Sequence, residues 1–170
     1  SPSRGLGDVY KRQILKGLSD SRVPGLEVSS GSLGHGLSVA TGIAYGAALN
    51  KSDQKIYVII GDGEENEGPI REAIQIAANH HLSNLMVIVD KNNFQAMGKT
   101  EDIIRQDKLH SQIESFDFEV LSINGHDEGA VNDAIQELWN SDGNRPKAII
   151  ANTIKGKGIS FMEGHSQWHN

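Results

Sequence analysis

Residues 55–93 read KIYVIIGDGEENEGPIREAIQIAANHHLSNLMVIVDKNN, and this stretch decides the fold. Its two ends, Lys55 to Ile60 and Leu85 to Asp90, are short apolar runs rich in β-branched and aliphatic residues, as in strands buried on both faces of a sheet. Between them, apolar residues recur at helical spacing from Ile70 to Ala78, and Pro69 suits the first turn of a helix. The stretch therefore predicts one βαβ unit.

The rest of the chain repeats this alternation of strand-like and helix-like segments. Phe118 to Ile123 and Lys147 to Thr153 resemble the first two strands, and Glu128 to Trp139 is an amphipathic helix expected to cover the outer face of the sheet. Leu37 to Leu49 is apolar nearly all round and rich in glycine and alanine, so we expect a buried helix that permits close approach of another backbone. The predicted fold class is α/β, a parallel sheet flanked by helices.

Composition narrows the function classes. The 170 residues, of which 37% are hydrophobic, are enough for one ordinary globular core. The net charge of -6 gives no general basic surface, so we expect neither nucleic acid nor a membrane as a partner. No apolar run approaches the roughly 20 residues that span a bilayer, and the N-terminus lacks the apolar region of a signal peptide. The absence of cysteine excludes disulfides and thiolate metal sites and suits a reducing compartment, so we expect a cytoplasmic location.

Polar side chains follow the first two predicted strands where each strand ends. Asp62 comes directly after the first strand, and Asn92 follows the second. Parallel strands joined by one crossover are often neighbours, about 4.8 Å apart, so these two oxygen ligands are expected to converge at one edge of the sheet. With a backbone carbonyl just after Asn92, they would form an incomplete shell of the kind that holds Mg²⁺ together with phosphate oxygens. Gly61 and Gly63 let the backbone approach an anion closely.

Other interpretations of the glycine-rich stretch fit less well. The dinucleotide pattern G-x-G-x-x-G fails because its third glycine falls on Asn66, and no P-loop pattern occurs in the chain. A calcium loop fails because Glu67 stands at the position that requires glycine, and the stretch follows a strand instead of a helix. A purely structural turn remains the alternative to a ligand site.

Three segments together resemble the transketolase family. Residues 61–63 read GDG, and Asn92 comes just after the next predicted strand. This arrangement is similar to the thiamine diphosphate signature. PGLEVSSGSLGHGLS at residues 24–38 resembles the transketolase segment before that signature, and NTIKGKGISFMEGHSQWHN at residues 152–170 resembles the end of the cofactor-binding domain in separately encoded N-terminal subunits. The resemblance covers Ile14 to Asn170 and implies a pyrophosphate-type, thiamine-diphosphate-binding domain with Mg²⁺. The implied reaction transfers a two-carbon ketol unit between phosphorylated sugars.

The resemblance assigns roles to residues that match the family's motifs. It implies that Asp62, Asn92 and the backbone carbonyl of Phe94 bind the metal, while Gly63 approaches the cofactor's diphosphate. Three further residues match positions that contact the cofactor's rings, although core packing is the alternative for the two apolar ones: Gly31, Leu33 and Ile154.

Polar candidates for catalysis and assembly follow from the same resemblance. His169 matches a family histidine near the diphosphate and substrate, where an imidazole could donate a hydrogen bond or move a proton. Glu67 and Glu72 match glutamates at the dimer interface that link paired cofactor sites, and Glu67 joins His169 as a catalytic candidate. We expect Glu64 and Glu65 to be solvated.

Some residues depart from the transketolase pattern and keep two alternatives open. Asn93 stands where transketolases often have glycine, and an Asn-Asn pair is common in the pyruvate-dehydrogenase type of thiamine enzyme. This favours the alpha-type chain of a 2-oxo-acid dehydrogenase as an alternative. Met97 replaces a frequent acidic residue, and Asn170 replaces the glycine that usually follows His169. A noncatalytic remnant of the same fold is the other alternative.

The family resemblance also divides the chain. Ser1 to Gln13 resemble no transketolase segment and look like translated sequencing-adapter read-through, with an irregular native segment as the alternative. We therefore predict a non-native or irregular segment at residues 1–13 and a partial, truncated cofactor-binding domain at residues 14–170. The family's early sugar-binding histidines and its pyrimidine-binding domain, which carries the cofactor-activating glutamate, have no match here. We expect a dimer or heterotetramer with a partner that supplies that domain, and no turnover by this chain alone.

Overall fold

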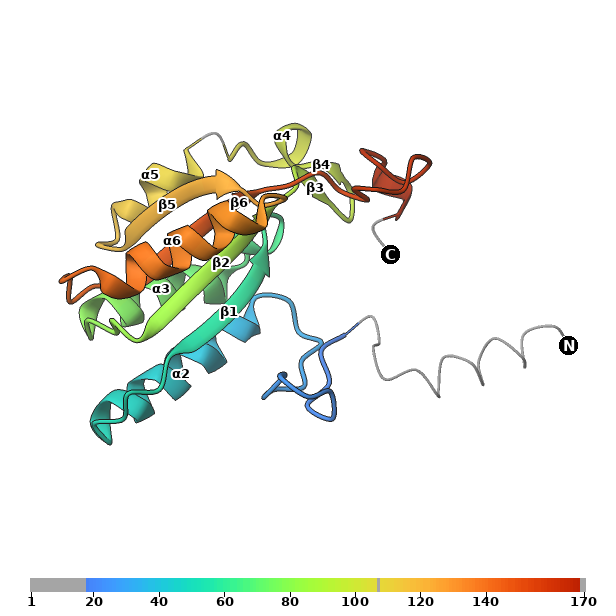
Figure 1. Cartoon of the computed structure of the whole chain (residues 1–170). Coiled ribbons are helices and arrows are strands. Elements are labelled where there is room, and N and C mark those ends of the chain that lie inside the picture. Colours follow the sequence, from blue (N-terminus) through green and yellow to red (C-terminus); the bar gives the residue numbers. More distant parts are fainter. Residues whose placement is uncertain (1–17, 107, 169–170) are drawn as a thin grey trace, which may run out of the picture. The chain divides into compact units, whose positions relative to one another are not determined.

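The computed structural model describes residues 18–106 and 108–168 (Figure 1). The predictions for residues 1–13 and for His169 lie outside the described residues. The chain divides into two units after Ser32, and the sheet with its helices belongs to the second unit. In the first unit, the described residues 18–32 form turns in which Ser30 N donates to the carbonyl of Ser19 at 3.2 Å.

A four-stranded parallel sheet forms the centre of the second unit. Its strands are β1 (Ile56–Gly61), β2 (Leu85–Lys91), β5 (Glu119–Asn124) and β6 (Lys147–Asn152), in the order β1-β2-β6-β5. All four predicted strands are confirmed, and so is the predicted fold class. A short antiparallel pair, β3 (Phe94–Gln95) and β4 (Gly98–Lys99), follows β2 and was not predicted.

Helices cover both faces of the sheet, as the amphipathic patterns predict. Apolar residues of α2 (His35–Leu49), α3 (Gly68–Asn79) and α5 (Leu109–Glu114) join one face of the sheet in the larger core cluster. On the other face, α6 (Glu128–Asn140) packs Ala134 and Leu138 against Met86 and Ile149. Figure 1 shows α6 crossing in front of β2 and β6. The shorter helices are α4 (Thr100–Ile103), η1 (Glu64–Asn66) and η2 (Ser166–Trp168).

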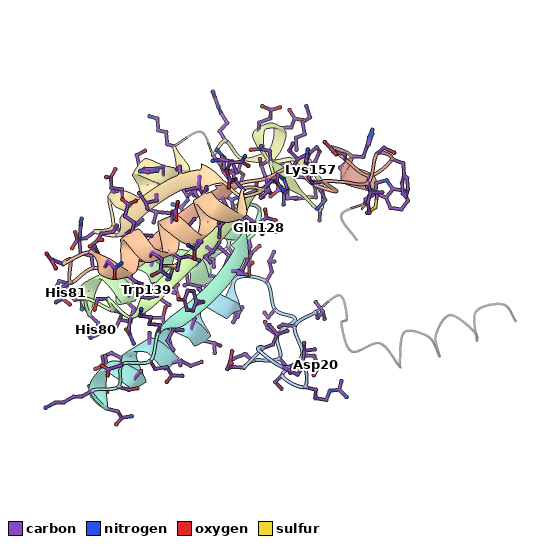
Figure 2. The ribbon with its side chains drawn as sticks, in the orientation of Figure 1. Asp20, His80, His81, Glu128, Trp139 and Lys157 are labelled. Atoms are coloured by element: carbon purple, nitrogen blue, oxygen red, sulfur yellow. The ribbon has the colours of Figure 1, made fainter. Side chains whose placement is uncertain are left out.

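The sequence predicts that the first two strands are buried on both faces of the sheet. This prediction is confirmed for β2 but is wrong for β1. β1 lies at the edge of the sheet, and the side chain of Ile59 is 71% exposed. The reason is that α6 packs on β2, β6 and β5. Its residue Trp139 (Figure 2) reaches β1, where the indole N–H donates to the hydroxyl of Tyr57 at 2.7 Å. One face of β1 is therefore apolar and largely open.

The prediction of a fully buried helix at Leu37 to Leu49 is wrong for the described residues. α2 buries one side against the sheet and α3 but exposes Val39, Ile43, Tyr45 and Leu49. A Cβ added at Gly42 would meet no described atom within 4 Å, so no backbone lies close to it. The apolar outer face of α2 is a surface that a partner could cover. Among the described residues, no helix is long and apolar enough to cross a membrane.

Candidate functional site

The ends of β1 and β2 bring Asp62 and the Asn92 loop together. The parallel ladder pairs Gly61 with Asp90, and Asp62 N donates to the carbonyl of Asp90 at 3.2 Å. Asp62 is only 1% exposed, and its Oδ2 accepts from Asn93 N at 2.6 Å, while its Oδ1 accepts from Gly63 N at 2.8 Å. The carboxylate therefore joins the two loops at the edge where open parallel sheets bind ligands.

The Asn92 side chain has a fixed orientation. Its Nδ2 donates to Oδ2 of Asp90 at 3.0 Å, and its Oδ1 accepts from Phe94 N at 3.0 Å. Asp90 is held in turn, because the hydroxyl of Thr153, just after β6, donates to its Oδ1. Since Nδ2 is committed to Asp90, the amide oxygen is the atom of Asn92 available to a metal.

The electrostatics of Asp62 suit a cation. Burial raises the pKa of Asp62 above its ordinary value, and the N–H groups of Asn93 and Gly63 oppose that rise. A buried carboxylate has lost the water that would stabilise its charge. A hard cation bound to its free lone pairs can supply that stabilisation. Among the described residues, no group of three or more His, Cys, Asp or Glu side chains could hold a metal. The donor set expected from the sequence, the Asp62 carboxylate, the Asn92 amide oxygen and the backbone carbonyl of Phe94, stays a prediction.

The backbone around these donors explains two residues. Asn93 has φ 65°, in the left-handed region that glycine and asparagine occupy most easily. Asparagine therefore meets a backbone requirement that glycine would also meet, and the dehydrogenase alternative suggested by Asn93 stays a prediction. A Cβ at Gly63 would lie 2.6 Å from Cβ of Gln95, so only glycine lets β3 pack against this turn.

The prediction that Glu64 and Glu65 are solvated is wrong, because Glu65 is buried and Glu64 is half-buried and hydrogen-bonded. Glu64 accepts from Gly34 N at 2.8 Å and from Gly61 N at 3.3 Å, so it ties the start of α2 to the end of β1. Glu65 is 4% exposed. The two residues begin the tight turn η1, which directs their side chains inward. Nothing in the local sequence distinguishes such a turn from an exposed acidic loop.

Substituting glutamine for Glu65 is expected to stabilise the protein at neutral pH but not at acidic pH. Burial raises the pKa of Glu65, while Arg71 and the amide of Gln106 oppose the rise. Because the folded pKa lies above the unfolded pKa, the native state binds the proton more tightly, and stability falls as pH rises from the ordinary glutamate value through the raised one. Removing the charge should raise the free energy of unfolding at neutral pH by on the order of 1 kcal/mol.

Urea denaturation at acidic and neutral pH measures this difference. The matched control is Glu137→Gln, because Glu137 is an exposed carboxylate on α6. If Glu65→Gln changed the free energy of unfolding equally at the two pH values, the charge of Glu65 would not be the source of the instability.

Other predicted site residues occupy different environments. Leu33, just before α2, is 58% exposed, and Ile154, after β6, is 43% exposed, so neither is a core residue. Their contacts with the cofactor rings stay predictions. Glu67 and Glu72 are exposed at the start of α3, and their interface role also stays a prediction. Gly31 lies in the first unit, where a Cβ would meet Leu18 Cδ1 at 3.2 Å.

His80 and His81 follow the end of α3 (Figure 2). The N–H of His80 donates to the carbonyl of Ile76, which completes the end of the helix. α3 connects the C-terminal end of β1 to the N-terminal end of the parallel strand β2. The end of α3 therefore lies near the N-terminal ends of the strands, whereas Asp62 lies at their C-terminal ends. These histidines have a structural explanation and take no part in the candidate site.

Comparison with known proteins decides the family. The family model described as "Transketolase, thiamine diphosphate binding domain" matches residues 17–170. The chain belongs to the transketolase family. The resemblance stated from the sequence is thus confirmed.

Individual relatives give the same result. An apulose-4-phosphate transketolase subunit from Phocaeicola vulgatus is 40% identical over 159 residues, covering 92% of this chain and 56% of that protein. The protein of the same name from Actinobacillus succinogenes is 44% identical over 149 residues, covering 88% and 53%. The crystal structure of transketolase from Campylobacter jejuni superposes with a TM-score of 0.80 at 35% identity, covering 86% of this chain and 24% of that one. The chain spans about half the length of the two curated relatives.

Proposed function

We propose that this chain is the cofactor-binding portion of a transketolase that transfers a two-carbon ketol unit between sugar phosphates, using thiamine diphosphate and Mg²⁺. One observation carries the proposal: the Asp62 carboxylate and the Asn92 amide are each oriented by their own hydrogen bonds at adjoining strand ends. The family, whose matching domain is described as thiamine-diphosphate-binding, supports the identity of the cofactor.

The residues divide the work of holding the cofactor. Asp62, Asn92 and the carbonyl of Phe94 would bind Mg²⁺, and Gly63 would let the backbone approach the diphosphate. The hydrogen bonds from Asn93 and Gly63 hold the Asp62 carboxylate before any ligand arrives, and Asp90 does the same for the Asn92 amide. When bound, thiamine diphosphate supplies an electron sink for breaking a carbon–carbon bond beside a carbonyl. This chain supplies placement and charge.

The proposed substrates and partner follow from the relatives. Two of them are named as one of the subunits of an apulose-4-phosphate transketolase, which supports a phosphorylated sugar as substrate and a separate partner chain. The partner would supply the pyrimidine-binding domain, in a dimer or heterotetramer located in the cytoplasm. The exposed apolar face of α2 (Val39, Ile43, Tyr45 and Leu49) and the exposed carboxylates of Glu67 and Glu72 are available for such contacts.

Titration of the chain with thiamine diphosphate tests the cofactor assignment. Calorimetry in the presence of Mg²⁺ should show binding of thiamine diphosphate. Loss of a residue that supports a metal ligand lowers metal affinity by roughly 10- to 100-fold, so chelating the metal itself should lower the cofactor affinity by at least that factor. Thiamine without the diphosphate is the control and should show no dependence on Mg²⁺. Equal affinity with and without Mg²⁺ would contradict the metal site, and a folded chain that ignores the cofactor would favour a noncatalytic remnant.

A further inference from the structure

Gln106 connects the candidate site to a distant part of the chain. It lies between α4 and α5 and is 7% exposed. Its Nε2 donates to the backbone carbonyl of Asp62 and lies 3.5 Å from Oε2 of Glu65. Gln106 is not among the site residues that the sequence suggested.

The orientation of the Gln106 amide is determined by its surroundings. Nε2 faces two oxygen acceptors, and the reversed amide would place Oε1 against both of them. Among the described residues, Oε1 has no hydrogen-bond partner although it is buried. A buried amide oxygen without a partner is unfavourable. The bonds made by Nε2 therefore explain why a polar side chain occupies this buried position.

The carbonyl that Gln106 holds belongs to the same peptide unit as the Gly63 N–H. A trans peptide is planar, so its carbonyl and its N–H point in opposite directions. Gln106 binds the carbonyl side of the Asp62–Gly63 peptide, and Oδ1 of Asp62 accepts from Gly63 N at 2.8 Å on the other side. Rotation of this peptide would break both bonds.

We propose that Gln106 is a positioning residue for the candidate cofactor site: it fixes the Asp62–Gly63 peptide, so that the Gly63 N–H keeps its bond to the Asp62 carboxylate and holds that carboxylate at the ends of β1 and β2. The role in cofactor binding rests on the proposed function. The fixing of the peptide does not, because it is a property of the chain without ligand. These two parts can be measured separately.

The variant Gln106→Met keeps the length of the side chain and removes its donor. Amide hydrogen exchange of Gly63, followed by NMR in the absence of ligand, should become at least about tenfold faster, because the peptide opens more often when it has lost a bond. Calorimetric affinity for thiamine diphosphate in Mg²⁺ should fall by about 10- to 100-fold, as for other supporting residues at metal sites. The matched control is Gln112→Met, because Gln112 is exposed on α5, and it should change neither quantity.

A second variant separates positioning from a merely structural role. Gln106→Lys retains an N–H donor of similar reach opposite Glu65, so it should keep slow exchange at Gly63, while its positive charge beside Asp62 should still weaken binding of the metal. Circular dichroism and the thermal midpoint of each variant report its folded fraction. Unchanged exchange at Gly63 in Gln106→Met would overturn the proposal. The proposal would also be overturned if the affinity lost in Gln106→Met were no larger than its unfolded fraction accounts for. If the unmodified chain fails to bind the cofactor, the proposed function fails, and the exchange rate at Gly63 still decides whether Gln106 holds the peptide.

Discussion

Replacing Asp62 with alanine is expected to abolish Mg²⁺-dependent binding of thiamine diphosphate, with a loss of affinity well beyond the roughly 10- to 100-fold seen when a supporting residue is removed. The side chain is the one charged donor proposed for the metal, and it is 1% exposed. Its removal also leaves the N–H groups of Asn93 and Gly63 without their acceptor. Calorimetric titration of the cofactor in Mg²⁺ measures the effect.

Two further variants separate the charge of Asp62 from its structural bonds. Asp62→Asn keeps the size of the side chain and one acceptor oxygen but removes the negative charge, so it should also lose most of the affinity. Glu137→Ala removes an exposed carboxylate on α6 and should have no effect. Glu64 is unsuitable as a control, because its carboxylate accepts from Gly34 and Gly61. Asp62→Asn binding as tightly as the unmodified chain would show that the metal does not depend on this charge.

The central part of the fold could be predicted because its signals are local. Two apolar runs of strand length, a helical repeat and a proline at the helix start lie within residues 55–93, and each acts over a few neighbouring residues. The connection of parallel strands then places Asp62 near Asn92 without further information. For the same reason, the metal donors were the site residues that the sequence alone could suggest before any family resemblance was considered.

The contacts that orient those donors could not be predicted, because they join segments far apart in the chain. The bond from Thr153 to Asp90 depends on β6 lying beside β2, an order that differs from the order in sequence. The burial of Glu65 depends on the tight turn η1 and on Gln106, which lies in the loop between α4 and α5. The exposure of Ile59 depends on where α6 stops covering the sheet. Each is a tertiary effect that overrides the local pattern.

The chain by itself is expected to show no measurable ketol transfer. The family model that matches residues 17–170 is the thiamine-diphosphate-binding domain. The resemblance assigns the cofactor-activating glutamate to a pyrimidine-binding partner and the early sugar-binding histidines to loops that have no match in this sequence. The metal and diphosphate ligands proposed here lie at the ends of β1 and β2, so binding without turnover is the expected state.

An assay of ketol transfer between sugar phosphates on three samples tests this division of the active site. The chain alone should be inactive, because the resemblance assigns activation of the cofactor to the partner. Addition of a pyrimidine-binding partner should give weak activity, since a sugar misplaced by about 1 Å can cost on the order of a hundredfold in rate. Only a longer chain that carries the early histidine loops, together with the partner, should reach full activity. Substantial turnover by the first sample would show that this chain contains more of the active site than Asp62, Asn92 and their neighbours supply. Decarboxylation of a 2-oxo acid by the third sample, in place of ketol transfer, would instead assign the chain to the dehydrogenase reaction.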